Sequence, residues 1–325
     1  MEIKALRSLI LSVLLKKYRR VDANLMTDVI LFGELSGKTT HGLIRLFVGE
    51  SSILAQKPKG KPEIIRKSKL SILIEGNGNP GMLVASLAMK EVIKLAKKSG
   101  FGIVGTNGCF SSSGCLSYYL EKTANENLIA IIMAHSPLAI CPYGGVEPLF
   151  GTNPISFGIP ANPRSLIFDM STAAISYGAI LRAKTLGYKL PENVVLDKEG
   201  SFTTDPNKAL AGAIVAFDRS YKGSGLAMMV EILGGLWTSA DFVGKNTIGG
   251  WGNLFMVFSP DLLLDVNQFK DRVSKLIETV RNSRTKDGDK VRIPGELTIS
   301  TRDLNMKRGT VEVEDRLIQE LKNLI

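Results

Sequence analysis

The stretch Gly37-Lys38-Thr39-Thr40-His41-Gly42-Leu43-Ile44-Arg45-Leu46 holds one of only two histidines in a chain of 325 residues. An imidazole can donate or accept a proton near neutral pH. Thr40 can hydrogen-bond it, Gly42 leaves room for a backbone or a ligand, and Arg45 can hold a carboxylate through its planar fork. On these residues alone, a histidine at a helix end and a solvated arginine explain the pattern at least as well as a site does.

Helices are expected on the N-terminal side of this stretch. Apolar residues at helical spacing over residues 2–19 predict a first helix, which ends in a basic cluster at 16–20. Asp22 is a candidate N-cap for a second helix that continues to Phe32. His41 then lies in a loop or at a helix start, and the Pro- and Lys-rich residues 57–62 predict a linker.

Beyond the linker, apolar strands alternate with amphipathic helices, which is typical of an α/β fold. Strands are expected at 70–74, 102–104, 128–133, 155–159, 166–169 and 254–258. Helices are expected at 82–98, 115–125, 222–236 and 268–282 and from residue 312 onward, and the 222–236 helix has the composition of a buried one.

Gly76-Asn77-Gly78-Asn79-Pro80-Gly81 follows the first of these strands and opens a helix. Its glycines have the spacing of a phosphate-binding loop. The proline inside it and the absence of a full strand–helix–strand context make a dinucleotide-binding fingerprint a weak interpretation of this stretch.

The composition is that of an ordinary globular protein, with 44% hydrophobic and 22% charged residues. The chain is long enough for one large domain or two lobes. The apolar runs are far shorter than a membrane span, and the N-terminus does not have the pattern of a signal peptide. We therefore expect a cytoplasmic protein that does not interact with a membrane.

Cys109, Cys115 and Cys141 form no CxxC pair and accompany no histidine cluster, which argues against a disulfide framework and against a metal site. The net charge of +10 is scattered along the chain. No nucleic-acid-binding motif accompanies it, so we expect no nucleic-acid partner. A small anionic substrate with a phosphate-bearing cofactor, or simply a basic surface, explains the charge.

A set of short segments, taken together and in order, carries a resemblance to a known family. They are Thr40-His41-Gly42 with Arg45, Pro142-Tyr143-Gly144-Gly145, Gly151-Thr152-Asn153-Pro154, Phe168-Asp169-Met170-Ser171, Tyr221-Lys222-Gly223-Ser224-Gly225 and Arg292-Ile293-Pro294-Gly295-Glu296. In order, spacing and wording they resemble the malate/L-lactate dehydrogenase family of the second type. That family includes sulfolactate, ureidoglycolate and diketogulonate oxidoreductases and reductases of cyclic 2-imino acids.

The resemblance implies an α/β fold with a mixed sheet that is not a Rossmann fold, with helical N- and C-terminal segments. It implies a helical, substrate-side lobe of residues 1–60 and 268–325, and a cofactor-binding α/β lobe of residues 61–267. It also implies a homodimer and NAD- or NADP-dependent hydride transfer at C2 of a small 2-oxo acid, without a metal. The cofactor supplies the hydride, and the protein orients the substrate.

Carried over residue by residue, the resemblance implies that His41 is the proton donor, with Thr40 and Asp169 as its relay partners. Arg45 becomes the clamp for the substrate carboxylate, and Thr152 lines the substrate site. A carboxylate near the imidazole is expected to raise its pKa and hold its tautomer. The positions that match cofactor contacts are Phe168, Met170, Ser171, Tyr221, Lys222, Gly295 and Glu296.

The chain departs from the family at residues 106–114, where most members carry a histidine and this chain has none. The hydroxyls of Ser111, Ser112 and Ser113 are candidates for phosphate or ribose binding there. The usual Ser-His-Gly is also Thr40-His41-Gly42 here, which keeps the hydroxyl.

Other interpretations of the individual residues remain open. Asp169 could cap a helix that begins at Ser171, Lys222 and Glu296 could be ordinary surface residues, and the turn at 151–154 could be purely structural. His135, which follows an apolar strand, fits a satisfied core histidine better than a site residue.

The function expected first is an NAD(P)H-dependent reductase of a 2-oxo acid of the malate/lactate or diketogulonate type. One alternative is a reductase of a cyclic 2-imino acid, such as piperideine-2-carboxylate or pyrroline-2-carboxylate. The other is a non-catalytic relative that binds a ligand, which the missing histidine at 106–114 would favour.

Overall fold

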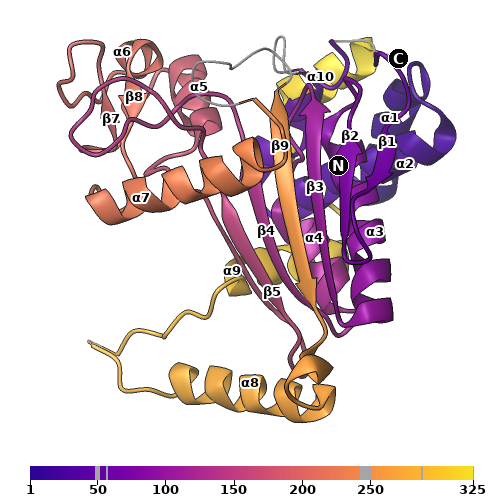
Figure 1. Ribbon diagram of the computed structural model, residues 1–325. Helices are drawn as coiled ribbons and strands as arrows, with labels where there is room; N and C mark the ends of the chain where they lie inside the picture. The colour runs from indigo at the N-terminus through magenta and orange to yellow at the C-terminus, as the bar shows by residue number, and fades with distance from the viewer. Residues whose placement is uncertain (48–51, 56–57, 242–249, 287, 325) are drawn as a thin grey trace.

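A mixed seven-stranded sheet forms the centre of the computed structural model, which describes residues 1–47, 52–55, 58–241, 250–286 and 288–324 (Figure 1). Lys57, in the predicted linker, lies outside them. The strands are β1 (Glu63–Arg66), β2 (Ser71–Glu75), β3 (Phe101–Cys109), β4 (Ile129–His135), β5 (Ile155–Ile159), β6 (Leu166–Met170) and β9 (Trp251–Phe258). Their order is β1-β2-β3-β9-β4-β5-β6, and β2 and β3 are the parallel pair. The predicted mixed α/β sheet is confirmed.

β9 lies in the middle of the sheet because its apolar residues are buried against both neighbours. Phe255 and Val257 are completely buried, and the strand pairs antiparallel with β3 on one side and β4 on the other. The edge strand β6 carries Asp169 and pairs with β5 alone. The predicted site residues Phe168, Asp169 and Met170 lie on this edge strand.

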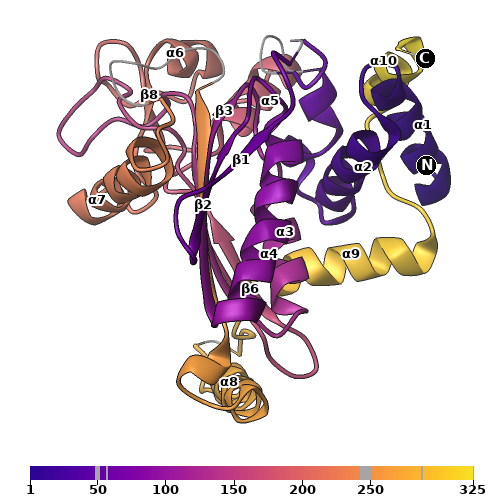
Figure 2. The same cartoon turned by 45° about the vertical axis from the view of Figure 1, so that its right-hand side comes forward.

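Helices cover both faces of the sheet (Figure 2). On one face lie α3 (Gly81–Ser99) and α4 (Leu116–Ala124), with α1 (Ile3–Leu15) and α2 (Arg20–Leu35) beyond them. On the other face lies α7 (Tyr221–Val230), which continues as the π-helical turn η4 (Glu231–Leu236). Val230 packs there in a small core with Met133 and Leu254.

A small lobe stands beside α7, with its own core around Ile140 and Val195. It contains the two-stranded sheet β7 (Val195–Leu196) and β8 (Ala213–Ile214), and the helices α5 (Tyr177–Leu186) and α6 (Pro206–Ala211). The sequence did not predict these elements, which are short and carry weak periodicity.

The C-terminal part follows β9 through η5 (Pro260–Leu262) and forms α8 (Val266–Arg281), α9 (Glu296–Arg308) and α10 (Asp315–Asn323). The N-terminus lies beside the segment that precedes α10, since the Met1 ammonium donates to the carbonyl of Val311 at 2.9 Å. Every described helix is too short or too polar to cross a bilayer. The predicted division into two lobes, 1–60 with 268–325 and 61–267, stays a prediction.

Asp22 is not the N-cap of the second helix. α2 begins at Arg20, and Asp22 lies in its first turn, where Arg19 Nε donates to its carboxylate at 2.8 Å. An acidic side chain in the first turn is favourable beside the positive end of the helix dipole, so it marks the helix start without capping it.

The helix expected at 222–236 is present as α7 and η4, but it is neither α-helical throughout nor fully buried. The α-helical hydrogen bonding of α7 ends at Val230 and changes to π-helical in η4. Met228, Met229 and Trp237 are 48, 47 and 60% exposed, so one side of this element faces outward. Its high apolar content therefore reflects an uncovered face as well as a core.

The glycine-rich stretch 76–81 does stand in a strand–helix–strand unit, because β2, α3 and β3 form a parallel crossover. Its backbone amides are nevertheless occupied by the protein. Gly76 and Gly78 donate to the carbonyls of Asn107 and Gly108, both at 2.8 Å, and a Cβ on Gly81 would collide with the carbonyl of Ser111. The glycines allow close packing on β3, and the stretch has no open nest of amides for a phosphate.

Candidate active site

The segment that carries His41 is held against the end of α2 by a buried acid. It forms two short helical turns, η1 (Thr39–His41) and η2 (Leu43–Leu46). Glu34 of α2 is 4% exposed, and its Oε1 accepts the backbone N–H of Leu43 at 2.6 Å. A Cβ at Gly42 would overlap the Glu34 side chain, so glycine is required for this close approach.

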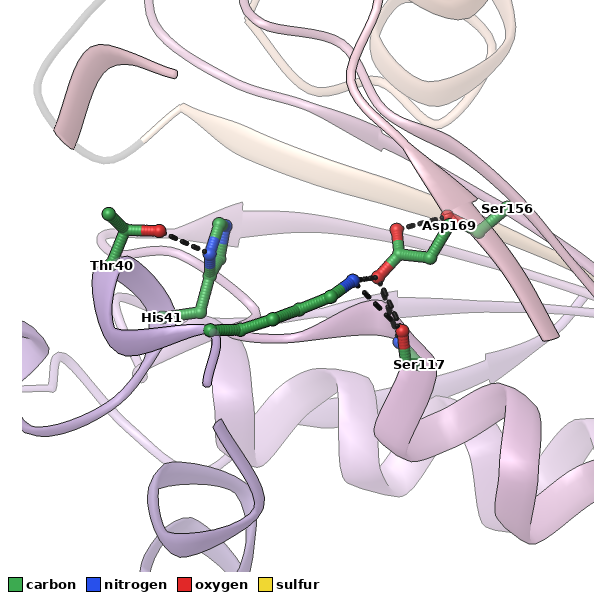
Figure 3. Close-up of polar contacts among 6 residues, drawn as sticks. Thr40, His41, Ser117, Ser156 and Asp169 are labelled. Carbon is green, nitrogen blue, oxygen red and sulfur yellow. Dashed lines mark hydrogen bonds and ion pairs between the residues drawn. The ribbon is translucent and has the colours of Figure 1, made fainter. Parts of the chain in front are cut away.

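His41 is oriented by its neighbour Thr40. The Thr40 hydroxyl and His41 Nδ1 are 3.0 Å apart, so the predicted contact between these neighbours is present (Figure 3). Gly178, in the first turn of α5, packs on the methyl group of Thr40. The imidazole is therefore oriented by one hydroxyl from its own turn, and that turn is braced from the small lobe.

Asp169 lies at the end of β6 and is bound by other partners. Its Oδ2 accepts from Lys38 Nζ at 2.7 Å, from Ser117 Oγ at 2.6 Å and from Ser117 N–H at 3.2 Å. Its Oδ1 accepts from Ser156 Oγ at 2.7 Å. Figure 3 shows Asp169 between Ser117 and Ser156, apart from the Thr40–His41 pair.

The expected direct partnership between Asp169 and His41 is therefore replaced by an ion pair between Asp169 and Lys38. The side chains of this pair are 12 and 27% exposed. The other interpretation of Asp169, as the cap of a helix that begins at Ser171, is wrong, because the next helix is α5 and Ser176 caps it.

The charges of these groups depend on one another. Burial alone would raise the pKa of Asp169, but the Lys38 ammonium and the hydroxyls of Ser117 and Ser156 hold it below its ordinary value. Burial works to lower the pKa of Lys38, and Asp169 more than compensates, so that pKa is raised. At neutral pH both groups are ionised.

The pKa of His41 is lowered. Burial is the largest cause, followed by the Arg45 and Lys38 cations, while Asp169 acts in the opposite direction and is outweighed. The sequence-based expectation of a raised pKa is wrong for the free protein, because the carboxylate is neutralised by a lysine that the prediction did not assign. The imidazole is neutral at physiological pH.

Arg45 follows one turn after His41 and fits the predicted carboxylate clamp. Burial lowers the pKa of Arg45 to about 10, which leaves it charged at neutral pH. Its Nε is buried and has no hydrogen-bond partner among the residues that the structure describes. A buried guanidinium donor without a partner costs free energy unless a ligand supplies an acceptor, and a carboxylate does so with two oxygens.

A cavity of about 340 Å³ opens beside Asp169, between β6, α4 and the loop before α9. Three of the predicted site residues, Phe168, Asp169 and Gly295, meet there. The remaining lining residues are Phe32, Lys38, Ser117, Glu121, Ile167, Arg292, Ile293, Pro294, Thr298 and Ile299.

The loop before α9 is pressed onto the edge of the sheet. Gly295 has φ +83°, and a Cβ there would strike the carbonyl of Ile167, so only glycine suits the position. Glu296 accepts the N–H of Ile293 at 3.1 Å and pairs with Arg281. Its carboxylate thus stabilises the loop that forms one wall of the cavity.

Thr152 and Ser171, predicted for substrate and cofactor, meet at the end of β6. Ser171 Oγ donates to the carbonyl of Thr152 at 2.7 Å, and Thr152 N–H donates to Ser136 Oγ at 3.0 Å. Met170 is the residue before Ser171 and pairs with Ile155 of β5. These residues build the turn that follows Asp169.

Two groups of predicted cofactor residues lie outside the cavity lining. The hydroxyls of Ser111, Ser112 and Ser113 are buried and bonded to Gly81 N–H, Gly114 N–H and Asn253 respectively. Tyr221 and Lys222 are exposed on the first turn of α7, which Ser220 caps. Their contact with a cofactor stays a prediction.

His135 is 1% exposed and lies 3.2 Å from the buried carboxylate of Glu231 in η4. This burial agrees with a core histidine, but neither ring nitrogen has a hydrogen-bond partner among the described residues, so the histidine is not satisfied as expected.

The groups that the sequence did not assign are Lys38, Ser117, Ser156 and Arg292. Lys38 and Arg292 stand inside quoted motifs, but a sequence gives no sign of which distant carboxylate or cavity they reach. Ser117 and Ser156 are ordinary helix-start and strand residues. Their role exists only because α4 and β5 flank Asp169.

The lining of the cavity can be compared with what a bound dinucleotide needs. It adjoins a second cavity of about 390 Å³ and shares Glu121, Ile167 and Ile299 with it, so the two form a trough along β6 and α4. Arg302, in the second cavity, has a buried Nη1 without a partner in the described chain. This unpartnered guanidinium donor suits an anionic group. Among the described residues, no His, Cys, Asp or Glu cluster could hold a metal ion.

Known proteins resemble this chain over nearly its whole length. The malate/L-lactate dehydrogenase family profile matches residues 1–322. The malate/(S)-sulfolactate dehydrogenase of Methanothermus fervidus is 34% identical over 311 residues, which are 93% of this chain and 90% of the relative. More distant relatives are the (2R)-3-sulfolactate dehydrogenase (NADP+) of Chromohalobacter salexigens (29% identity, 93% and 91% covered) and the ureidoglycolate dehydrogenase (NAD+) of Escherichia coli O157:H7 (26%, 90% and 85%).

Solved structures agree in fold. The sulfolactate dehydrogenase from Methanocaldococcus jannaschii superimposes with a TM-score of 0.87 at 32% identity and covers 100% of this chain and 96% of its own. The Δ1-piperideine-2-carboxylate reductase from Pseudomonas syringae has the same TM-score at 24% identity, covering 100% and 99%, and shares the fold. The match over residues 1–322, together with this agreement in fold, shows that the chain belongs to the malate/L-lactate dehydrogenase family.

Proposed function

We propose that this protein is an NAD(P)-dependent oxidoreductase that interconverts a small 2-hydroxy acid and its 2-oxo acid. The observation that carries the proposal is a neutral His41 followed, four residues further on, by Arg45 with a buried, unpartnered donor among the described residues. Relatives named as malate, sulfolactate and ureidoglycolate dehydrogenases support the same class, because each of these substrates is a 2-hydroxy acid.

Each residue has a defined task in this mechanism. Arg45 binds the substrate carboxylate and so fixes the position of C2. In the oxidation, neutral His41 accepts the proton of the C2 hydroxyl, and Thr40 orients the imidazole. In the reduction, the protonated form of His41 returns this proton to the forming alkoxide. The bound nicotinamide supplies or removes the hydride.

For the cofactor, we propose the trough along β6. Phe168 lies on the exposed edge strand, and the loop with Gly295 and Glu296 closes one wall. Arg292 supplies positive charge there, which suits phosphates. Relatives are named for NAD+ and for NADP+, so both cofactors enter the test.

The test combines binding and turnover. Calorimetry with NADH and NADPH is expected to give binding of at least one of them. Both cofactors are then assayed with malate, sulfolactate, lactate, ureidoglycolate and diketogulonate and with the matching 2-oxo acids. Binding of neither cofactor at millimolar concentration contradicts the proposal and favours a ligand-binding relative. If the protein turns over piperideine-2-carboxylate and none of the 2-oxo acids, the proposed function is wrong and the protein is an imine reductase.

We also propose a homodimer, built on the uncovered side of α7 and η4. This α7 face comprises the exposed residues Met228, Met229, Ile232, Leu236 and Trp237. A contiguous apolar face of this kind is typical of a protein–protein interface.

A further inference from the structure

Lys38 is the group of the site that the proposed mechanism does not yet use. It precedes η1, three residues before His41, and its side chain reaches Asp169 of β6 at 2.7 Å and Ser117 of α4 at 3.2 Å. It also lines the 340 Å³ cavity. One lysine thus connects the His41 turn to the edge of the sheet.

The hydrogen bonds of Asp169 are fully committed in this arrangement. Lys38 and Ser117 provide three donors to Oδ2, and Ser156 provides one to Oδ1. His41 has Thr40 as its hydrogen-bond partner instead. The carboxylate that would otherwise stabilise an imidazolium is therefore bound and neutralised by the ammonium of Lys38.

We propose that Lys38 is a positioning residue that binds Asp169 in an ion pair and thereby withholds this carboxylate from the imidazole of His41. This inference rests on the proposed function for its consequence in catalysis. The protonation state of His41 itself is a property of the free protein and is tested without turnover.

Burial is the largest cause of the lowered His41 pKa, and the surrounding charges adjust it further. Arg45 from η2 and Lys38 from the turn before η1 oppose the imidazolium, and Asp169 from β6 favours it. Lys38 itself faces Asp169 and the buried thiol of Cys115. Without the lysine, the Asp169 charge is uncompensated, and its effect of raising the pKa of His41 is no longer opposed by Lys38; a nearby opposite charge shifts a pKa by about 1 or more.

The direction of the reaction follows from this balance. Oxidation moves a hydride from C2 to the oxidised nicotinamide and the hydroxyl proton to His41, so it needs the neutral imidazole. Reduction needs the protonated one. Lys38 thus extends oxidation of the hydroxy acid toward lower pH, and its removal shifts the acidic limb of the oxidation profile toward higher pH.

The first experiment is an NMR titration of the histidine ring signals of the free protein. The chain has two histidines, and His41→Asn identifies the signal of His41 by its loss. Lys38→Met is expected to raise the His41 titration midpoint by about one pH unit or more. Lys38→Arg keeps the charge and should keep the low midpoint. Lys90→Met removes an exposed lysine of α3 and should change nothing.

The same titration in an Asp169→Asn background separates two routes. If Lys38 acts through Asp169, Lys38→Met raises the His41 midpoint in the Asp169→Asn background by less than half as much as it does when Asp169 is present. An equal rise, or no rise in either background, overturns the proposal. Lys38→Gln serves as the second variant if circular dichroism shows that Lys38→Met is not folded.

The second experiment measures kcat/KM for hydroxy-acid oxidation from pH 9 down to pH 3.5, because the pKa of His41 lies at about 3. The acidic limb of Lys38→Met should move upward with the NMR midpoint, and that of Lys38→Arg should not. A raised NMR midpoint without any turnover contradicts the proposed function and leaves the role of Lys38 intact. An active enzyme whose His41 midpoint is unchanged by Lys38→Met supports the proposed function and contradicts the role of Lys38.

Discussion

At the scale of single residues, His41 depends on a hydroxyl neighbour for its orientation and on three charges for its protonation. We expect His41→Ala to reduce turnover by about 10²-fold to 10⁴-fold, because a positioned general acid–base group contributes a factor of this size. Cofactor affinity should stay near that of the wild type, since His41 does not line the trough along β6. Steady-state kinetics and calorimetry measure the two. An unchanged turnover would remove His41 from the mechanism.

Arg45 is expected to act on substrate affinity. Arg45→Gln removes the charge and the fork, and a hydrogen bond to a charged group is worth about 1.5–3 kcal/mol. The KM for the 2-hydroxy acid should therefore rise by about 10-fold to 100-fold. Arg45→Lys should recover part of this loss, because it restores the charge without the bidentate geometry. A KM within twofold of the wild type for Arg45→Gln would exclude the clamp.

The residue scale also shows where a sequence stops being informative. His41, Thr40 and Arg45 could be singled out because they stand within six positions of one another. The partner of Asp169 could not, because Lys38 is 131 residues away in the chain and meets it only after β6 joins the sheet. The sign of the His41 pKa shift was missed for this reason.

At the scale of elements, Glu34 couples α2 to the His41 turn. Burial raises its pKa to about 7, although the N–H of Leu43 opposes this. A carboxyl whose folded pKa lies above its unfolded value binds more protons in the folded state, so stability falls as pH rises from about 4.5 through 7. Glu34→Gln keeps the acceptor for Leu43 and cannot ionise.

We therefore expect the free energy of unfolding of the wild type, measured with urea, to fall by up to ~3 kcal/mol more than that of Glu34→Gln between pH 5 and pH 8. Glu192→Gln is the matched control, since this acid is exposed and lies far from the turn in sequence. Parallel pH dependence of Glu34→Gln and wild type would mean that Glu34 is not protonated at neutral pH.

Strands and their order were unequally predictable. The apolar runs of β4 and β5 gave their positions within two residues, because a buried strand needs such a run. The place of β9 between β3 and β4 could not be predicted, since pairing with distant strands leaves no local signal. α9 was missed because its apolar residues do not gather on one side of the helix, so no apolar stripe marks it.

At the scale of the whole molecule, the α7 face lies on the side of the sheet opposite to α1 and α2 (Figure 2). Trp237 is 60% exposed, and Met228 and Met229 are each about half exposed. Large apolar side chains at this density destabilise a monomer in water, because their burial is worth about 25 cal/mol per Å². Association through this face would cover them.

We expect Met229→Asp to weaken the dimer, because a carboxylate at the centre of an apolar interface must be desolvated without a partner. Analytical ultracentrifugation should give a dimer for the wild type and a mainly monomeric protein for the variant at micromolar concentration. Val21→Asp is the control, since it places the same charge on an apolar residue of α2 that is 68% exposed. A monomeric wild type would contradict the proposed dimer, and a dimeric Met229→Asp would place the interface on another surface.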